Sequence, residues 1–224
     1  MNLSISEIKR LAKLSLKGNW GLAIGFTLVI FLFNMILPTI VEMVMSGGFA
    51  VWWEQDIPPA GASIASTIIS VILIPLSIAV YWFYLALIRK ENPEISAAFA
   101  VYKDGKLCLK LIWTSILQAI YLFLWSLLLV IPAIIKSFSY SQTFFILRDH
   151  PEYKANQAIT ESKKLMKGYK WKLFVLYLSF IGWAILCVLT LGIGFLWLIP
   201  YVTTSLATFY NELIFPRLKE EKVM

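Results

Sequence analysis

Long runs of uncharged, mostly apolar residues divide this chain into segments separated by short charged stretches. No charged residue occurs in the 32 positions between Asp56 and Arg89, or in the 39 positions between Lys172 and Glu212. A helix needs about 20 residues to cross a hydrocarbon core of roughly 30 Å. The longer run therefore predicts two crossings, with a turn at Gly192-Ile193-Gly194 because paired glycines break a helix.

The whole pattern predicts an all-α integral membrane protein with six transmembrane helices. The third and fourth are expected to be separated near Ile131-Pro132, with Lys136 at the turn. The fourth is short, so a re-entrant arm is the alternative for residues 133–148. The six expected helices span roughly 20–45, 62–88, 110–131, 133–148, 172–190 and 194–214.

Composition supports a membrane protein over a soluble one. Hydrophobic residues make up 59% of the chain, charged residues 15%, and the mean hydropathy is +0.76. Soluble domains are about 45–50% apolar and about 25% charged. A globule of 224 residues could not bury that much apolar surface in one core. Soluble enzymes and disordered chains are therefore excluded.

The distribution of basic residues predicts the orientation. With six crossings, 19 of the 20 Lys and Arg fall on one face and only Lys136 falls on the other. The positive-inside rule then places both termini in the cytoplasm. The net charge of +7 is explained by these flanking residues, so no nucleic-acid partner is expected.

The chain also shows an internal repeat. Ile74-Pro75, Ile131-Pro132 and Ile199-Pro200 lie 14, 16 and 17 residues before Arg89, Arg148 and Arg217, counted from the proline. At 1.5 Å per residue, the three prolines lie at a similar depth toward the outer leaflet. Ile88-Arg89-Lys90-Glu91 also parallels Leu147-Arg148-Asp149. We predict one membrane domain, 1–224, with three pseudo-repeat units at about 4–90, 91–148 and 149–216 and a short cytoplasmic tail at 217–224.

Each unit is expected to begin with an interfacial amphipathic helix. Glu7-Ile8-Lys9-Arg10-Leu11-Ala12-Lys13 parallels Glu161-Ser162-Lys163-Lys164-Leu165-Met166-Lys167. Basic side chains beside a span attract anionic lipid. Plain anchoring in the membrane is the alternative role. The predicted lipid-headgroup residues are Lys9, Arg10, Lys13, Lys163, Lys164 and Lys167.

Pro75, Pro132 and Pro200 predict kinks, because proline removes an intrahelical hydrogen bond. Three kinks at one depth could shape a vestibule facing the outside. The alternative is that these prolines mark packing kinks or helix starts.

No catalytic, cofactor or metal site is predicted. His150 is the only histidine, and Cys108 and Cys187 are too far apart in sequence for a typical ligand pattern. Both thiols are expected to be reduced. No Gly-x-Ser-x-Gly elbow or phosphate-binding loop occurs. The expectation is therefore a protein that is not an enzyme.

Three stretches resemble a known bacterial family. They are Leu124-Trp125-Ser126-Leu127-Leu128-Leu129-Val130-Ile131-Pro132, Gly168-Tyr169-Lys170-Trp171-Lys172-Leu173-Phe174, and the run from Leu178 to Gly194. The family is the multi-pass membrane group called domain of unknown function 975. Ala133 and His150 stand where Gly and Asn are expected in that family. The resemblance implies a bacterial plasma-membrane protein and carries no catalytic residues.

These observations favour a multi-pass membrane protein that interacts with lipids or binds a partner, in envelope stress or in resistance to membrane-active peptides. The expected partners are membrane lipids, with a protein partner or a second copy of the chain left open. The alternative is a transporter or channel for a small or amphiphilic solute.

Overall fold

The computed structural model describes residues 4–221, with side chains through Ile214, and this part of the chain forms helices and turns without strands. The helices are α1 (Ile5–Leu16), α2 (Trp20–Met45), α3 (Phe49–Glu54), α4 (Ala60–Ile72), α5 (Ile74–Ile88), α6 (Ser96–Phe99), the 3₁₀ helix η1 (Ala100–Lys103), α7 (Gly105–Leu128), α8 (Val130–Tyr140), α9 (Thr143–Asp149), α10 (Ala155–Leu165), α11 (Lys170–Leu189) and α12 (Phe195–Glu221).

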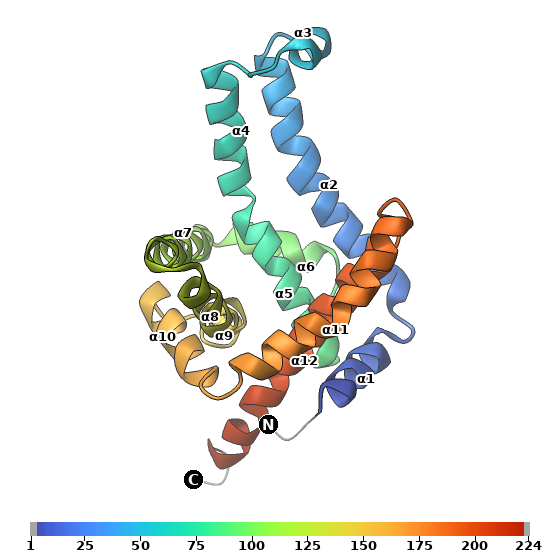
Figure 1. Cartoon of the computed structure of the whole chain (residues 1–224), viewed down its shortest axis with the longest axis vertical. Coiled ribbons are helices and arrows are strands. Elements are labelled where there is room, and N and C mark those ends of the chain that lie inside the picture. Colours follow the sequence, from blue (N-terminus) through green and yellow to red (C-terminus); the bar gives the residue numbers. More distant parts are fainter. Residues whose placement is uncertain (1–3, 222–224) are drawn as a thin grey trace.

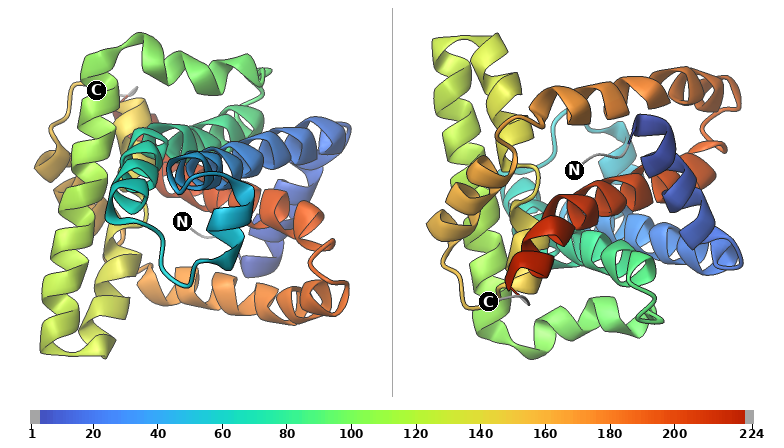
Figure 2. Two further views of the ribbon diagram at one scale, coloured as in Figure 1. Left: turned by 90° about the horizontal axis from the view of Figure 1, so that it is seen from above. Right: turned by 90° about the horizontal axis from the view of Figure 1, so that it is seen from below.

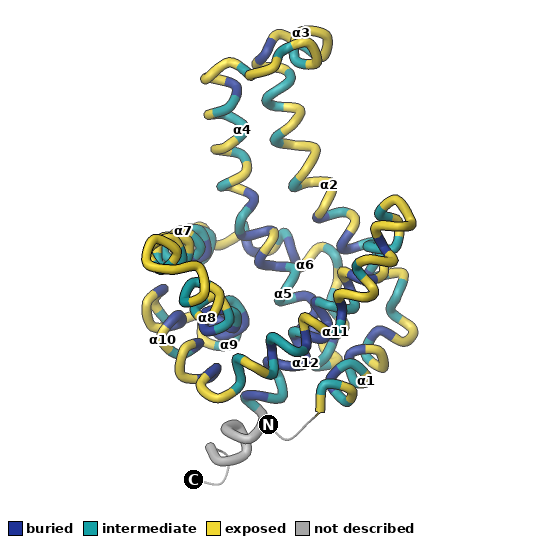
Figure 3. The backbone as a smooth tube through the Cα atoms, viewed as in Figure 1, coloured by how far each residue is buried: buried dark blue, intermediate teal, exposed yellow. Residues whose placement is uncertain are grey.

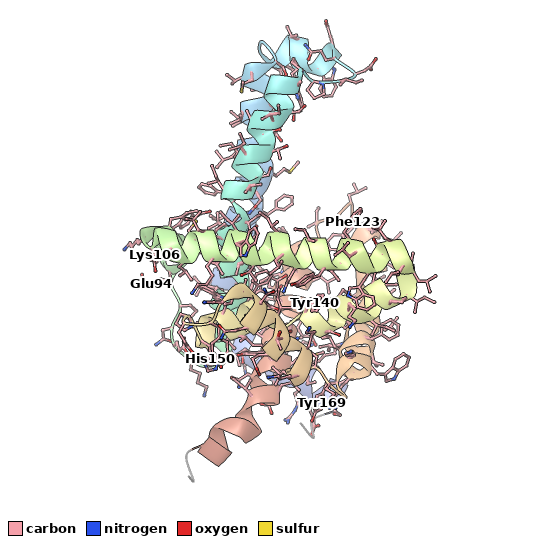
Figure 4. The ribbon with its side chains drawn as sticks, turned by 90° about the vertical axis from the view of Figure 1, so that its left-hand side faces the viewer. Glu94, Lys106, Phe123, Tyr140, His150 and Tyr169 are labelled. Atoms are coloured by element: carbon pink, nitrogen blue, oxygen red, sulfur yellow. The ribbon has the colours of Figure 1, made fainter. Side chains whose placement is uncertain are left out.

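Three helical hairpins extend from a common centre. Helix α2 packs on α4 with α3 at the tip, α7 packs on α8, and α11 packs on α12. The α2–α4 hairpin points upward in Figure 1, whereas α7 runs across that direction in Figure 4. Figure 2 shows α7 and α8 along one side of the molecule and α11 along another. The hairpins therefore diverge from one another.

Five helical segments of the described chain are long and apolar enough to cross a membrane. They are Trp20–Met45, Ala60–Ile88, Gly105–Leu128, Val130–Asp149 and Lys170–Leu189. Helix α2 has 26 residues and a length of about 39 Å, which exceeds a hydrocarbon core of roughly 30 Å. This extra length allows α2 to cross at a tilt.

Helix α12 is a continuous helix where the sixth crossing was expected, but it is not among the five. Its middle carries buried hydroxyl side chains, including Thr203, Thr204, Ser205 and Thr208. Each donates to the carbonyl oxygen four residues earlier; the Thr204 Oγ1 to Pro200 O distance is 2.6 Å. The helix therefore satisfies its own polar groups and can lie at the protein centre. The sixth crossing stays a prediction.

The core, which we call the hub, lies where the three hairpins meet. It is built mainly from α5, α9, α12 and the first half of α2, and Figure 3 shows buried residues concentrated there. Phe26 stacks on Phe83 with ring centroids 3.9 Å apart. The buried Tyr84 hydroxyl lies 2.6 Å from Thr27 Oγ1, so its polar end has a partner. Aromatic packing with satisfied hydroxyls therefore holds α2 against α5 within the hub.

The outer parts of the hairpins expose apolar side chains. Leu129 and Ile131, at the α7–α8 tip, are 67% and 71% exposed, and Leu191, at the α11–α12 tip, is 94% exposed. A soluble monomer rarely shows such extended apolar surface. Lipid is the solvent that suits these surfaces, because a helix satisfies the backbone groups of its interior within the segment.

The second hairpin turns at a different residue from the one predicted. Helix α7 ends at Leu128, and Leu129 has an extended conformation with φ −164° and ψ 145°. Lys136 lies within α8, not at the turn, and its Nζ is 4.3 Å from the centroid of the Trp125 ring. The prediction of the turn at Lys136 was therefore wrong. Pro132 falls in the first turn of α8, where a helix needs no proline N–H.

In the first and second hairpins, the second arm, which we call the returning arm, is interrupted rather than continuous. Leu73 separates α4 from α5, and residues 141 and 142 separate α8 from α9. At the second break, Ser162 Oγ of α10 accepts from Gln142 N at 3.1 Å and donates to Ser139 O at 2.8 Å. This one hydroxyl bonds backbone groups on both sides of the break, so α10 holds the two pieces in place.

Two of the three expected amphipathic helices are well formed. Helices α1 and α10 each bury one apolar face, and each is followed by a glycine in the left-handed region, Gly18 at φ +85° and Gly168 at φ +86°. This backbone turns the chain into the next long helix at little steric cost. The second copy is reduced to the short α6 and η1. Helix α6 contacts α5, α10 contacts α9, and α1 contacts α12.

Cys108 and Cys187 are free, as expected.

Candidate functional site, a basic groove along α1

Helix α1 is fixed by its cap and by its apolar face. Glu7 N donates to Ser4 Oγ at 3.2 Å, and Ser4 N donates to Glu7 Oε2 at 2.6 Å, which together form a capping box. The apolar side chains Ile8, Ala12 and Leu16 are fully buried. The helix therefore has a fixed rotation, which leaves its basic face turned away from the core.

A groove of about 820 Å³ runs along α1, between this helix and parts of α11 and α12. It brings together residues nearly 200 positions apart in sequence. We call it the α1 groove. Its polar and aromatic lining consists of Ser6, Lys9, Arg10, Lys13, Lys17, Trp20, Ser179 and Tyr201.

Lys9 is the most constrained cation of the α1 groove. Its Nζ donates to Ser179 O and Ser179 Oγ, both at 3.2 Å, and lies 4.4 Å from the centroid of the Phe180 ring. Burial lowers the pKa of Lys9, and the neighbouring Lys13 charge lowers it further. The site therefore holds an ammonium group that lacks a compensating negative charge.

Among the described residues, no carboxylate forms an ion pair with the cations of the α1 groove, Lys9, Arg10, Lys13 and Lys17. Hydrogen bonds from Ser4 lower the pKa of Glu7, and the Glu7 carboxylate lies near enough to Arg10 for the arginine charge to help lower it. Arg10, Lys13 and Lys17 are exposed. Leu14, which is 55% exposed, and Ile5 add apolar surface beside these charges. The arrangement suits a ligand with an anionic group and an adjoining apolar part.

The second predicted basic triad does not join this groove. Lys163, Lys164 and Lys167 are exposed on α10 or directly after it. Figure 1 shows α10 and α1 on opposite sides of the molecule. Lys164 Nζ already pairs with Glu161 Oε1 at 2.6 Å. Of the six predicted headgroup residues, the structure brings together only Lys9, Arg10 and Lys13.

The three prolines occupy early positions in their helices. Pro75 is the second residue of α5, Pro132 the third of α8 and Pro200 the sixth of α12. Pro75 and Pro200 are buried, while Pro132 lies near the exposed tip of the second hairpin. The first-turn positions of Pro75 and Pro132 match the alternative interpretation, in which the prolines mark helix starts, whereas Pro200 lies beyond the first turn of α12.

The sequence analysis missed a cluster of ion pairs where α5, α9 and α12 meet. Arg89 binds Asp149 through two contacts of 2.6 and 2.7 Å, and Tyr210 Oη donates to Asp149 Oδ2 at 2.8 Å. Arg148 Nη2 contacts Glu91 Oε2 at 2.5 Å. Arg89 thus pairs with Asp149, which directly follows Arg148. Arg148 in turn pairs with Glu91, which lies two residues after Arg89. The parallel between Ile88-Arg89-Lys90-Glu91 and Leu147-Arg148-Asp149 was the signal that could have revealed it.

Comparison with known proteins gives one result. No curated protein and no solved structure matches the chain. The family model described as "Protein of unknown function (DUF975)" matches residues 1–135 and 126–215, which together span nearly the whole sequence. The resemblance identified from the sequence is confirmed, and the chain belongs to the DUF975 family.

Proposed function

We propose that this protein binds anionic phospholipid headgroups in the α1 groove and acts as a membrane protein without catalytic activity. The observation that carries the proposal is the gathering of four cations beside apolar and aromatic side chains, with no carboxylate paired to them in the described part of the chain. The negative charge of a phosphate in the groove would raise the pKa of Lys9, and so offset the lowering caused by burial and by the Lys13 charge.

The proposal includes a topology in a bacterial plasma membrane. The chain crosses six times, as three pseudo-repeats, with both termini in the cytoplasm. The packing of α6 on α5, α10 on α9 and α1 on α12 supports the repeats, because each amphipathic segment packs on the second arm of one hairpin. Helix α1, from the start of the chain, packs in this way on α12 of the third hairpin. In this orientation the α1 groove faces the inner leaflet, whose surface carries negative charge.

Lipid selectivity tests the function. The triple variant Arg10→Gln, Lys13→Gln and Lys17→Gln should lower the affinity for phosphatidylglycerol at least tenfold, since each cation near an anionic surface contributes measurably to binding. Native mass spectrometry in mild detergent, with phosphatidylglycerol and phosphatidylcholine added at matched concentrations, would measure lipid retention.

The matched control is the triple variant Lys163→Gln, Lys164→Gln and Lys167→Gln, which removes the same charge from an exposed surface outside the groove. It should keep most of the phosphatidylglycerol. Equal losses in both variants would show that only total charge matters. Equal retention of the two lipids by the unmodified protein would reject anionic selectivity.

A transporter or channel for a small or amphiphilic solute is the alternative function. The observation in its favour is a cavity of about 190 Å³ whose lining includes the polar side chains of Tyr81, Gln118 and Gln142 among apolar ones. Solute flux into proteoliposomes that contain the protein, compared with empty liposomes, would distinguish transport from binding alone.

A further inference from the structure

The cavity of about 190 Å³ that contains Gln142 lies in the hub and takes residues from all three hairpins. Tyr81 comes from α5, Gln118 from α7, Tyr140 from α8 and Tyr177 from α11. Figure 4 shows Tyr140 near the centre of the molecule, below α7. No charged side chain is among the described residues that line this hub cavity. It is separate from the α1 groove and shares no lining residue with it.

Gln142 gives the hub cavity an unpaired acceptor. The residue lies in the break between α8 and α9 and is only 1% exposed. Its Nε2 donates to Ser141 Oγ at 2.8 Å, whereas its Oε1 has no hydrogen-bond partner. Buried polar groups without a partner are costly, and a bound molecule is one way to satisfy them.

Two tyrosine hydroxyls provide donors in the same space. Tyr81 and Tyr177 line the hub cavity, and in the described part of the chain neither hydroxyl has a hydrogen-bond partner. Two phenolic donors and one amide acceptor therefore face a space without charges. This set matches a ligand that both donates and accepts hydrogen bonds.

The hub cavity opens between the second and third hairpins. Ser137 and Tyr177 are exposed, while Tyr140 and Gln142 are buried, so the former two mark the mouth and the latter two the interior. The mouth lies beside the contact of α8 with α11, where the rings of Phe138 and Tyr177 have centroids 6.1 Å apart. An engineered cavity of about 150 Å³ holds benzene, so this space holds a molecule of about six heavy atoms.

We propose that the hub cavity binds an uncharged polyol group of the size of glycerol. Gln142 Oε1 accepts a hydrogen bond from one ligand hydroxyl, and the Tyr81 and Tyr177 hydroxyls donate to ligand oxygens. The group comes either from the glycerol headgroup of a neutral lipid that enters between α8 and α11, or from free glycerol.

Binding to the full chain in phosphatidylcholine nanodiscs tests both sources. One arm measures photocrosslinking of a photoreactive monoacylglycerol, and the other measures equilibrium dialysis of radiolabelled glycerol. Tyr177→Phe removes a single oxygen at the mouth and should weaken binding roughly three- to tenfold, the worth of one hydrogen bond. Tyr153→Phe, which removes a hydroxyl outside this cavity, should change nothing.

Each outcome decides the proposal. Saturable crosslinking that Tyr177→Phe weakens assigns the site to a neutral lipid, and saturable glycerol binding with the same variant pattern assigns it to a free polyol. Gln142→Leu should abolish binding. If this buried substitution prevents folding, the result with Tyr177→Phe decides the proposal by itself. Absence of saturable binding in both arms, or binding that Tyr177→Phe leaves unchanged, would overturn the proposal and leave a cavity that holds only water.

Discussion

Replacement of Asp149 by alanine is expected to lower the free energy of unfolding by about 3–5 kcal/mol. The Asp149 side chain is 17% exposed, and its carboxylate accepts hydrogen bonds from both terminal nitrogens of Arg89 and from the Tyr210 hydroxyl. Its removal leaves Arg89, whose side chain is 24% exposed, with the 3.3 Å hydrogen bond from its Nε to Asn211 Oδ1 and the more distant Glu91 charge among the described residues. Reversible unfolding in mixed detergent and dodecyl sulfate would measure the change.

The matched control is Glu152→Ala, which removes the carboxylate of an exposed pair. Glu152 Oε1 lies 3.2 Å from His150 Nδ1, and both side chains are at least half exposed. This change should alter stability by about 0.5 kcal/mol or less. The double variant Arg89→Met with Asp149→Leu should recover part of the loss, because it removes both charges together. Equal effects of Asp149→Ala and Glu152→Ala would contradict the structural role of the cluster.

Replacement of Phe145 by alanine is expected to cost about 3–5 kcal/mol. Phe145 is 1% exposed, and its ring stacks on Tyr210 at 5.0 Å and meets Tyr81 edge-on at 5.5 Å. Truncation leaves a cavity between residues from the first, second and third hairpins. The same unfolding experiment would measure the loss.

Phe123→Ala serves as the control for this substitution. Phe123 lies on α7 and is 62% exposed, so its ring contacts the surroundings rather than the hub. Its truncation should change stability by about 0.5 kcal/mol or less. A comparable loss in both variants would mean that the outer hairpins, and not the hub, hold the structure together.

The positions of the long helices could be predicted because a hydrocarbon core limits where charges occur. The expected span 20–45 coincides with α2. The break at Leu73 lies directly before Ile74-Pro75, so it fits the alternative in which Pro75 marks a helix start, although no charge marks this position in the run from Asp56 to Arg89. The break at Gln142 depends on Ser162, a tertiary partner 20 residues away, which no local pattern reveals.

The candidate site was predictable only in part. The helical period of Ile8, Ala12 and Leu16 fixes which face of α1 is basic, so Arg10 and Lys13 follow from the sequence. The other wall of the groove does not follow from the sequence, because Ser179 and Tyr201 contact α1 through tertiary packing. Lys163 on α10 shows the same local pattern as Lys9 on α1 but lies on an open surface. Pattern alone therefore could not distinguish a groove from an exposed face.

The proposed lipid site requires the α1 groove to face the cytoplasm. Lys13→Cys, Lys163→Cys and Trp53→Cys would each be introduced into a chain with Cys108→Ala and Cys187→Ala and treated with a membrane-impermeant maleimide in intact and in permeabilised cells. We expect the cysteine at Trp53, in α3, to react in intact cells, and those at Lys13 and Lys163 to react only after permeabilisation. Reaction at Lys13 or Lys163 in intact cells would contradict the account.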